Sequence, residues 1–280
     1  MILFKKAADI NNWLLKSKAA GKKIGFIPTM GALHRGHTSL IDASKHAGSI
    51  SVCSIFVNPA QFNDAKDFDN YPTTIEKDID ALEKAGCDVL FLPSVSEIYP
   101  AGTGNAKTYD LGYLETVLEG KYRPGHFQGV CLVVHRLLTI VPADDLYLGQ
   151  KDYQQCMVIK KLVELEKLIT TIHICPTLRE TSGLAMSSRN MRLTAEAREQ
   201  ALKIFESLSY LKNNIKPGDL TGLKQTAVNL LTNAGFKVDY VEIATAGDLD
   251  IINHWDGNRK LLAVAAAFLG DVRLIDNMLL

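Results

Sequence analysis

The stretch Ile24-Gly-Phe-Ile-Pro-Thr-Met-Gly-Ala-Leu-His-Arg-Gly-His37 decides the fold of this protein. Residues 24–28 are typical of a buried strand, and residues 38–47 have the apolar spacing of a helix. The turn between them contains Gly31 and Gly36, which allow tight turns and a close approach of the backbone to a ligand. Because the start of such a helix presents unpaired N–H groups and the positive end of the helix dipole, this junction suits a phosphate.

The alternation of strand and helix continues to about residue 176. Short, almost continuously apolar strands separated by amphipathic helices indicate a parallel sheet that is covered on both faces. Right-handed crossovers then give a Rossmann-like, doubly wound α/β domain over residues 1–176. The expected strands are 24–28, 51–57, 88–92, 145–148 and 171–174, and the expected helices are 38–47, 73–85, 129–140 and 152–166.

The pattern changes after residue 176. Residues 176–190 are rich in Ser, Thr, Arg and Gly and are typical of a loop. Helices and strands that follow in separate runs predict a smaller C-terminal α+β domain over residues 177–280, with Thr194 placed to cap its first helix. The expected helices are 194–213 and 220–234, and the expected strands are 237–243, 261–268 and 272–275.

The composition argues against several classes of protein. The 280 residues include 31 basic and 31 acidic side chains, whereas a protein that binds nucleic acid through its phosphates normally has an excess of Lys and Arg. No apolar run reaches the roughly 18–20 residues of a membrane-spanning helix, and the first residues become polar too soon for a secretory signal. The five cysteines are scattered without a CxxC pair, which favours buried free thiols in a reducing compartment. We therefore expect a soluble cytoplasmic protein with neither a nucleic-acid nor a membrane partner.

His34 and His37 follow the first of these strands and are three residues apart. They share one face if the turn is helical, and imidazole N–H groups can donate to phosphate oxygens and to the charge that develops on a leaving pyrophosphate. Two alternatives stay open. The histidines could be ordinary surface residues near a turn, or a metal-binding pair, although no third ligand is adjacent in the sequence.

A second polar cluster, Gly149-Gln-Lys-Asp-Tyr-Gln-Gln155, lies at another junction of strand and helix. Lys151 could neutralise phosphate charge, Asp152 could accept from a ribose hydroxyl, and Gln155 could bind a polar substrate one helical turn later. The alternative is an ordinary helix start with Asp152 as its N-cap.

Two further segments carry polar side chains that suit a ligand. Met186-Ser-Ser-Arg-Asn190 offers hydroxyl groups and one Arg, as expected of a mobile clamp on a triphosphate, and its alternative is a generic polar hinge. Phe56-Val-Asn-Pro-Ala-Gln-Phe62 ends the second strand, and its Asn58 and Gln61 in a mostly apolar wall would suit a small hydroxy acid. Asn58 alternatively caps a turn before Pro59.

These motifs resemble, in order and spacing, those of the pantoate–β-alanine ligase (pantothenate synthetase) family along essentially the whole chain. The matching segments are Pro28–His37, Phe56–Phe62, Arg123–Phe127, Gly149–Gln155 and Met186–Asn190. The wider superfamily comprises nucleotidyltransferases with an HxGH signature, and residues 186–189 resemble their second, KMSKS-type signature. The resemblance implies an ATP-dependent, AMP-forming ligase of coenzyme A biosynthesis. Pantoate carboxylate would attack the α-phosphate of ATP, and β-alanine would then attack the pantoyl adenylate to give pantothenate.

The resemblance also implies a role for each matching residue. Mg²⁺ would accompany ATP with Asp78 as its partner in the chain, the C-terminal domain would act as a lid, and the protein would be a homodimer. The implied catalytic residues are His37, His34, Lys151 and Arg189, and the residues for pantoate and β-alanine are Gln61, Gln155, Asn58 and Arg123. The implied ATP-binding residues are Met30, Gly31, Ala32, Leu33, His34, Arg35, Gly36, His37, Gly149, Gln150, Lys151, Asp152, Leu178, Met186, Ser187, Ser188 and Arg189.

The chain departs from the family pattern at a few positions. Thr73 stands where the family often has Arg, which concerns a local helix cap and its salt bridge, and Leu178 stands where the family often has Val beside the adenine. Neither position touches the two histidines. Two other functions stay open: a related adenylate- or nucleotidyl-transferring enzyme that acts on a different small acid, and a nucleotide-binding regulatory module without catalysis.

Overall fold

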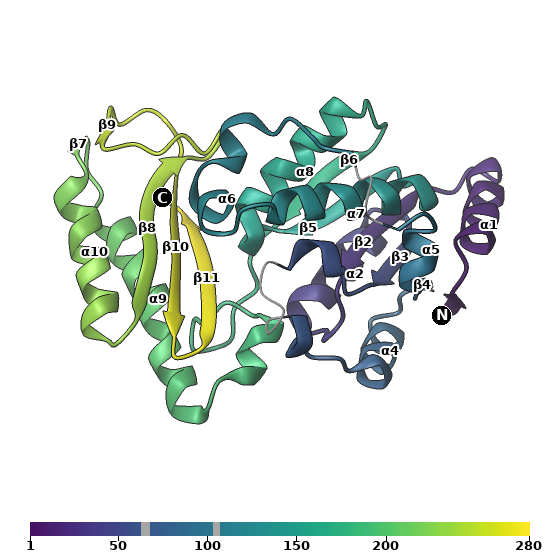
Figure 1. The fold of residues 1–280 in the computed structure, drawn as a ribbon, viewed down its shortest axis with the longest axis horizontal. Helices are drawn as coiled ribbons and strands as arrows, with labels where there is room; N and C mark the ends of the chain where they lie inside the picture. The colour runs from purple at the N-terminus through teal and green to yellow at the C-terminus, as the bar shows by residue number, and fades with distance from the viewer. Residues whose placement is uncertain (63–67, 103–106) are drawn as a thin grey trace. The chain divides into compact units, whose positions relative to one another are not determined.

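The computed structural model describes residues 1–62, 68–102 and 107–280, and the chain divides into two compact units (Figure 1). Unit 1 comprises Met1–Gln150 and Gln155–Pro176. Unit 2 comprises Lys151–Gln154 and Thr177–Leu280. The sequence predicts residues 151–154 in the first domain, whereas they group here with the C-terminal residues.

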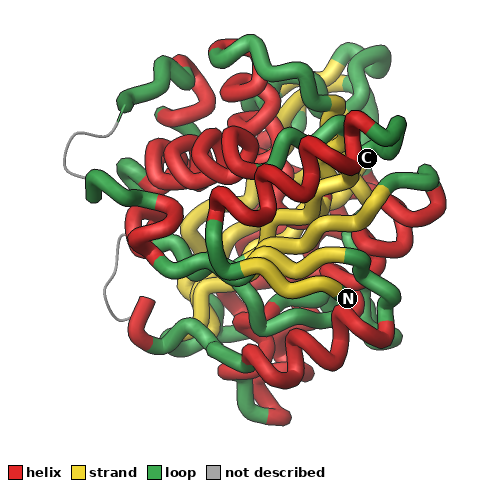
Figure 2. The backbone as a smooth tube through the Cα atoms, turned by 90° about the vertical axis from the view of Figure 1, so that its right-hand side faces the viewer, coloured by secondary structure: helices red, strands yellow, loops and turns green. Residues whose placement is uncertain are grey.

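Unit 1 is built on a six-stranded parallel sheet. β2 lies between β3 and β5, so the order of the strands reverses around it. Figure 2 shows helices on both sides of the strands nearest the N-terminus, and the predicted Rossmann-like α/β architecture is confirmed. The strand order is β1 (Ile2–Phe4), β4 (Val89–Phe91), β3 (Ile50–Ile55), β2 (Ile24–Thr29), β5 (Asp145–Gly149) and β6 (Thr171–Cys175).

Local backbone geometry decides where the helices of unit 1 begin. α7 (His126–Ile140) starts three residues before its predicted position, because Gly125 takes a left-handed φ of 81° and turns the chain into the helix. α8 (Tyr153–Leu165) starts one residue late, because Gln150–Asp152 form the 3₁₀ turn η3. The other helices and turns are α1 (Ala7–Ala19), α2 (Arg35–His46), α4 (Ile75–Lys84), α5 (Val95–Ile98), α6 (Leu118–Tyr122), η1 (Pro59–Gln61) and η2 (Gly112–Glu115).

The sequence predictions missed the first two elements, β1 and α1. β1 has three residues at the edge of the sheet, and Ile2 and Leu3 are exposed, so its apolar pattern is too short to indicate a strand. A distant residue supports the start of α1, since the carboxylate of Glu97 accepts from the N–H of Ala7 at 2.9 Å. Neither the pairing of β1 at the edge of the sheet nor the bond from Ala7 to Glu97 has a local signal in the sequence.

The core of unit 1 is formed largely by its strands. Phe26, Val52 and Leu90 on neighbouring strands are fully buried, as expected of a parallel sheet with helices on both faces. All five cysteines are free thiols and four are buried, and burial raises the pKa of the Cys53 thiol, which keeps it unreactive. Among the helices of the described ranges, none is long and apolar enough to cross a membrane.

Unit 2 combines an antiparallel sheet with two helices, which confirms the predicted α+β character. Its sheet has the order β11 (Val272–Leu279), β10 (Leu261–Leu269) and β8 (Lys237–Thr245), and α9 (Ala195–Asn214) and α10 (Thr221–Asn233) share its core. A small second sheet pairs β7 (Gly218–Asp219) with β9 (His254–Trp255). The hydroxyl of Thr194 accepts from the N–H of Ala197 at 3.2 Å, so the predicted cap of α9 is confirmed. β11 is four residues longer than predicted, because Asp276 and Asn277 continue the strand.

A close approach between α7 and η1 gives a test of the packing in unit 1. A Cβ atom on Gly129 would lie 2.2 Å from the carbonyl oxygen of Ala60, so Gly129→Ala forces the two backbones apart. We expect a loss of about 1–3 kcal/mol in the free energy of unfolding, measured by urea denaturation. Gly222→Ala in α10 is the matched control, because no atom lies within 4 Å of its added Cβ, and its stability should be equal or slightly higher. Equal stabilities of the two variants would contradict this packing.

Candidate active site

The first candidate motif follows β2, at the position where the strand order reverses. β3 and β5 flank β2 on its two sides, and their chains continue in opposite directions across the sheet. In open parallel sheets, ligands bind beyond the carboxyl ends of the strands at such a switch point. The turn at residues 30–34 leaves β2 there, and β5 ends with Gly149 at the same edge of the sheet.

The turn at residues 30–34 has an unusual backbone. Gly31 and Ala32 both have positive φ, 82° and 49°, and left-handed geometry is rare and costly for a residue with a Cβ. A side chain at Gly31 would also meet Asp78 and Ile55 at 3.0 and 3.1 Å. Thr29 secures the start of the turn, because its hydroxyl donates to the carbonyl of Ser54 and accepts from the N–H of Gly31.

Asp78 of α4 holds this turn in place. Its Oδ2 accepts from the N–H of Ala32 at 2.9 Å, and its Oδ1 accepts from the N–H of Leu33 at 2.7 Å and from the hydroxyl of Thr74 at 3.0 Å. The residue is 1% exposed. Its carboxylate is thus committed to hydrogen bonds within the protein, which argues against the predicted role as a partner of Mg²⁺. No group of three or more His, Cys, Asp or Glu residues suited to a metal occurs in residues 1–62, 68–102 and 107–280.

His34 and His37 form the N-terminal cap of α2. Nδ1 of His34 accepts from the N–H of Gly36 at 3.1 Å, and Nδ1 of His37 accepts from the N–H of His34 at 3.3 Å. Their ring centroids are 4.1 Å apart. Because a backbone N–H can only donate, each Nδ1 lacks a proton, and the neutral imidazole carries its hydrogen on Nε2. The capping geometry therefore fixes one tautomer, with an Nε2–H donor, on both rings.

Asn58 and Gln61 lie in the segment after β3, and the structure distinguishes them. Both amide hydrogens of Asn58 are used, at 3.2 Å to Oε1 of Gln61 and 3.0 Å to the carbonyl of Gly129. Its Oδ1 accepts from the N–H of Ala60 and from the hydroxyl of Tyr99. Burial raises the pKa of Tyr99, so this hydroxyl stays protonated as a donor. The hydrogen-bonding capacity of Asn58 is therefore filled inside the protein.

Gln61 has a weaker set of partners for its donors. Its Nε2 lies 2.9 Å from Sδ of Met30, and a thioether is a poor acceptor. Its Oε1 is oriented by Asn58, and its main-chain carbonyl accepts from the ring of His126 at 2.8 Å. The amide of Gln61 is thus held in place by Asn58, while its Nε2–H groups would bond an oxygen acceptor more strongly than they bond the thioether. This is the arrangement expected of a ligand-binding group.

Arg123 and His126 belong to a chain of contacts that ends on Gln61. Nη1 of Arg123 lies 3.1 Å from Nε2 of His126 and 3.5 Å from the carboxylate of Glu119. Since Nδ1 of His126 donates to the carbonyl of Gln61, Nε2 of the neutral ring accepts from Arg123. His126 lies in a segment that matches the family, but its neighbours in the chain indicate no role for it. Only the fold brings it within hydrogen-bond distance of Gln61, a predicted substrate-binding residue.

The Gly149–Gln155 motif is divided between the two units. Gln155 lies in the first turn of α8 in unit 1 and is half-buried. Lys151 and Asp152 belong to unit 2, where Nζ of Lys151 lies 3.8 Å from the Asp152 carboxylate. Asp152 ends the turn η3 and directly precedes Tyr153, the first residue of α8, so its position also fits the alternative of an N-capped helix start.

The segment between the last strand of unit 1 and α9 is a folded hairpin and turn. Arg179 and Ala185 pair as an antiparallel bridge, and the N–H of Met186 donates to the carbonyl of Leu178 at 3.1 Å. Ser187 then caps the 3₁₀ turn η4 (Ser188–Arg192), because its hydroxyl accepts from the N–H of Arg189. Of the predicted ATP-binding residues in this segment, Leu178 and Met186 are thus joined by a main-chain hydrogen bond and Ser187 and Arg189 by a cap, while Ser188 is the first residue of η4.

Comparisons with known proteins identify the family. The profile of pantoate-beta-alanine ligase matches residues 2–279. The chain belongs to the pantoate–β-alanine ligase family. It is 42% identical to the pantothenate synthetases of Cytophaga hutchinsonii and Porphyromonas gingivalis, over 100% and 99% of this chain and 99% of each relative.

Solved structures of the family have the same fold. The pantothenate synthetase of Thermus thermophilus is 34% identical and superimposes with a TM-score of 0.87 over 99% of both chains. The pantoate-beta-alanine ligase of Francisella tularensis, solved with beta-gamma ATP and beta-alanine, is 40% identical with a TM-score of 0.84, over 100% of this chain and 97% of that one. The resemblance predicted from the motifs is confirmed, and the protein is an ATP-dependent ligase of this family.

Asp78 provides a test of how the histidine turn is held. The substitution Asp78→Asn replaces one of the two carboxylate oxygens by an NH₂ group, so the N–H of Ala32 or Leu33 loses its acceptor. It also removes the negative charge that strengthens both bonds. We expect the free energy of unfolding to fall by about 2–3 kcal/mol in urea denaturation. Asp80→Asn is the control on the same helix, since its pair with Lys84 is exposed and contributes little. If Asp78→Asn kept full stability and changed only the Mg²⁺ requirement of the enzyme, the metal-binding role would be restored.

Proposed function

We propose that this protein condenses (R)-pantoate with β-alanine to pantothenate by way of a pantoyl adenylate. In the first step, the pantoate carboxylate attacks the α-phosphate of ATP and pyrophosphate leaves. In the second, the amine of β-alanine attacks the acyl carbon and AMP leaves. The observation that carries the proposal is the fixed pair of imidazoles at the carboxyl end of β2, in a chain of this family.

The chemistry requires positioning and neutralisation of charge. Attack of a carboxylate on a phosphoryl centre needs no covalent help from a protein nucleophile, but the leaving pyrophosphate gains charge. The Nε2–H groups of His34 and His37 would donate to that charge without rearrangement, because the capping bonds already fix both rings. Lys151 and Arg189 would add positive charge.

The remaining residues would bind the substrates. Gln61 would bind pantoate and meet β-alanine, since its donors have only a thioether as partner among the hydrogen bonds found in the described ranges. Gln155 and Arg123 would bind the acid, and Asn58 would orient Gln61, because a direct contact with substrate would displace one of its own bonds. ATP would be bound in unit 1 by residues 30–37, 149 and 150, and in unit 2 by Lys151, Asp152, Leu178 and residues 186–189.

Other parts of the proposal concern the metal, the assembly and the compartment. Mg²⁺ would be held chiefly by the ATP phosphates, as is usual for this ion, and no catalytic step is assigned to it here. We further propose a homodimer in the cytoplasm, which light scattering of the purified protein and cell fractionation would test. The C-terminal unit would serve as the lid.

The function itself is tested by product analysis. The protein is mixed with ATP, Mg²⁺, pantoate and β-alanine, and mass spectrometry should find pantothenate and AMP. ATP–pyrophosphate exchange that depends on a different acid would indicate the related adenylate-forming enzyme, and ATP binding without exchange for any acid would indicate the regulatory module.

His37→Asn separates the structural role of this histidine from its chemical role. The Asn oxygen can replace Nδ1 as acceptor for the His34 N–H, but the Nε2–H donor is lost. We expect the pantoate-dependent exchange rate to fall by about 10²–10³-fold with little change in the melting temperature. His46→Asn, at the exposed end of the same helix, should leave the rate unchanged. A normal exchange rate in folded His37→Asn would remove the histidine from the mechanism.

Gln155→Leu tests the identity of the acid site. The substitution keeps the approximate size of the side chain but leaves a polar group of the substrate without a partner, which typically costs about 1–3 kcal/mol. The pantoate KM of the exchange reaction should rise strongly while the ATP KM moves little. Lys151→Met should instead lower kcat, because its charge matters most as pyrophosphate leaves. Weakened ATP binding with unchanged pantoate KM in Gln155→Leu would contradict this division of the motif.

A further inference from the structure

The last strand of unit 2 carries two adjacent buried polar residues near its end, Asp276 and Asn277. They are 5% and 3% exposed and pair with Ala265 and Val264 of β10. Buried polar side chains in a strand need partners to offset the cost of leaving water. Each of the two has partners outside the sheet, in a different segment of the chain.

Asp276 binds the hairpin through Arg179. The guanidinium makes two hydrogen bonds to the Asp276 carboxylate, at 2.6 and 3.0 Å, and donates to the carbonyls of Gly183 and Asn277 at 3.1 Å. Its plane lies over the ring of Phe205 in α9 at 4.7 Å. Burial raises the pKa of Asp276, and the hydrogen bonds and charge of Arg179 counteract that shift. The strand is thereby bound to Arg179, which in turn is bound to Gly183 within the hairpin that carries Leu178 and Met186.

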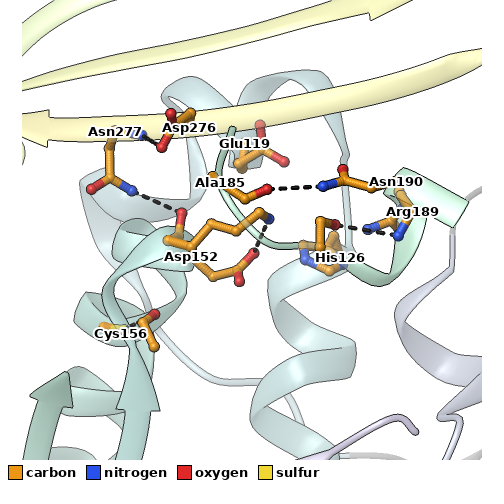
Figure 3. A network of polar contacts seen from close by, with 12 residues as sticks. Glu119, His126, Asp152, Cys156, Ala185, Arg189, Asn190, Asp276 and Asn277 are labelled. Carbon is orange, nitrogen blue, oxygen red and sulfur yellow. Dashed lines mark hydrogen bonds and ion pairs between the residues drawn. The ribbon is translucent and has the colours of Figure 1, made fainter. Parts of the chain in front are cut away.

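Asn277 binds the main chain at Lys151. Its Nδ2 donates to the carbonyl of Lys151 at 2.8 Å (Figure 3). Two residues later, the hydroxyl of Tyr153 donates to the carbonyl of Ala246 at 2.5 Å, so residues 151–154 are attached to unit 2 at both ends. These two bonds join the segment to β11 and to Ala246, the residue after β8.

Neighbouring residues of a strand point to opposite faces of the sheet. Asp276 shares its face with Val272 and Leu274, which pack in the core beside α9, and Asn277 lies on the other face. We propose that β11 is a common anchor for two nucleotide-binding segments, with Asp276 and Arg179 positioning residues 178–189 and Asn277 positioning Lys151. The assignment of these segments to ATP rests on the proposed function. Asp276, Asn277 and Arg179 touch neither substrate nor reacting atoms, and act through the residues they hold.

A purely structural role for these bonds makes different predictions from a positioning role. A second ion pair on the same sheet, Arg273 of β11 with Asp239 of β8 at 2.8 Å, is of similar burial and joins two strands of the sheet to each other. Asp239→Asn is therefore a matched control for the loss of a polar contact at this sheet. If the bonds of Asp276 and Asn277 served only to stabilise the unit, their loss would resemble the control.

The experiment compares Asn277→Ala, Asn277→Asp and Asp276→Asn with Asp239→Asn and the unaltered protein. Asn277→Asp keeps the shape of the side chain but places an acceptor, in place of the donor, opposite the Lys151 carbonyl. Asn277→Ala removes the donor without adding a charge and replaces Asn277→Asp in the comparison if that variant does not fold. Hydrogen–deuterium exchange should accelerate at residues 151–154 in the Asn277 variants and at residues 178–189 in Asp276→Asn. In the exchange reaction, kcat should fall roughly ten- to a hundredfold, as small misplacements of charge-stabilising groups typically cause, while the pantoate KM stays near normal.

The outcomes are distinct. Local acceleration that is confined to the expected segment, with a lowered kcat and a melting temperature near that of Asp239→Asn, supports the anchor. Unchanged hydrogen–deuterium exchange at both segments, or a kcat equal to that of the control, overturns the proposal. If the unaltered protein shows no pantoate-dependent exchange, the proposed function fails, and the segment-specific hydrogen exchange alone then decides whether β11 anchors both segments.

Discussion

The carboxylate of Asp78 accepts from two successive backbone N–H groups, and the geometry of the histidine turn depends on this contact. Successive amides rarely point to one acceptor, and they do so here because Gly31 and Ala32 take left-handed backbone angles. Such angles cost about 1–2 kcal/mol for a residue with a side chain. Two charge-assisted hydrogen bonds in a buried site offset that cost. The turn places His34 at the N-cap position of α2, where the bond from the N–H of Gly36 orients its ring.

A second buried network extends this order to the neighbouring segment of unit 1. Asn58 joins Tyr99, Gly129 and Gln61, and its four hydrogen bonds leave it no alternative conformation of similar energy. Such saturated polar networks are rigid, because each broken bond would leave a buried group unpaired. The rigidity reaches the amide of Gln61, whose Nε2 lies 2.9 Å from the thioether sulfur of Met30. A residue whose own hydrogen-bonding capacity is filled thus fixes the orientation of its neighbour's side chain.

Unit 2 follows the same physical logic with a strand in place of a turn. Side chains of adjacent residues on β11 leave the sheet on opposite faces, so one short segment of backbone can hold two others in a fixed relation within the unit. A buried carboxylate paired with a guanidinium is poor evidence of stability, because desolvation opposes the attraction of the charges. Its value lies in defining one arrangement of the hairpin, since the two-pronged contact tolerates little rotation.

Elements and motifs that depend on neighbours along the chain can be predicted from the sequence alone. Apolar runs and helix periodicity placed five of the six strands of the parallel sheet and the helices α2, α4, α7 and α8. Thr194 was recognised as a cap, HxGH after a strand indicated a phosphate site, and five motifs in order indicated the family. Other contacts become visible only in the folded chain. Asp78 accepts from the N–H groups of the turn, and the hydrogen-bonding groups of Asn58 are all used. His126 bonds the carbonyl of Gln61, and Asn277 bonds the carbonyl of Lys151. The partners are far apart in the chain: 45 and 46 residues for the contacts of Asp78, and 41 and 71 residues for those of Asn58 with Tyr99 and Gly129. The separation is 65 residues for His126 with Gln61 and 126 residues for Asn277 with Lys151. The spacing of residues along the chain reports on local periodicity and turns, whereas a hydrogen bond across such distances exists only once strands have paired and helices have packed.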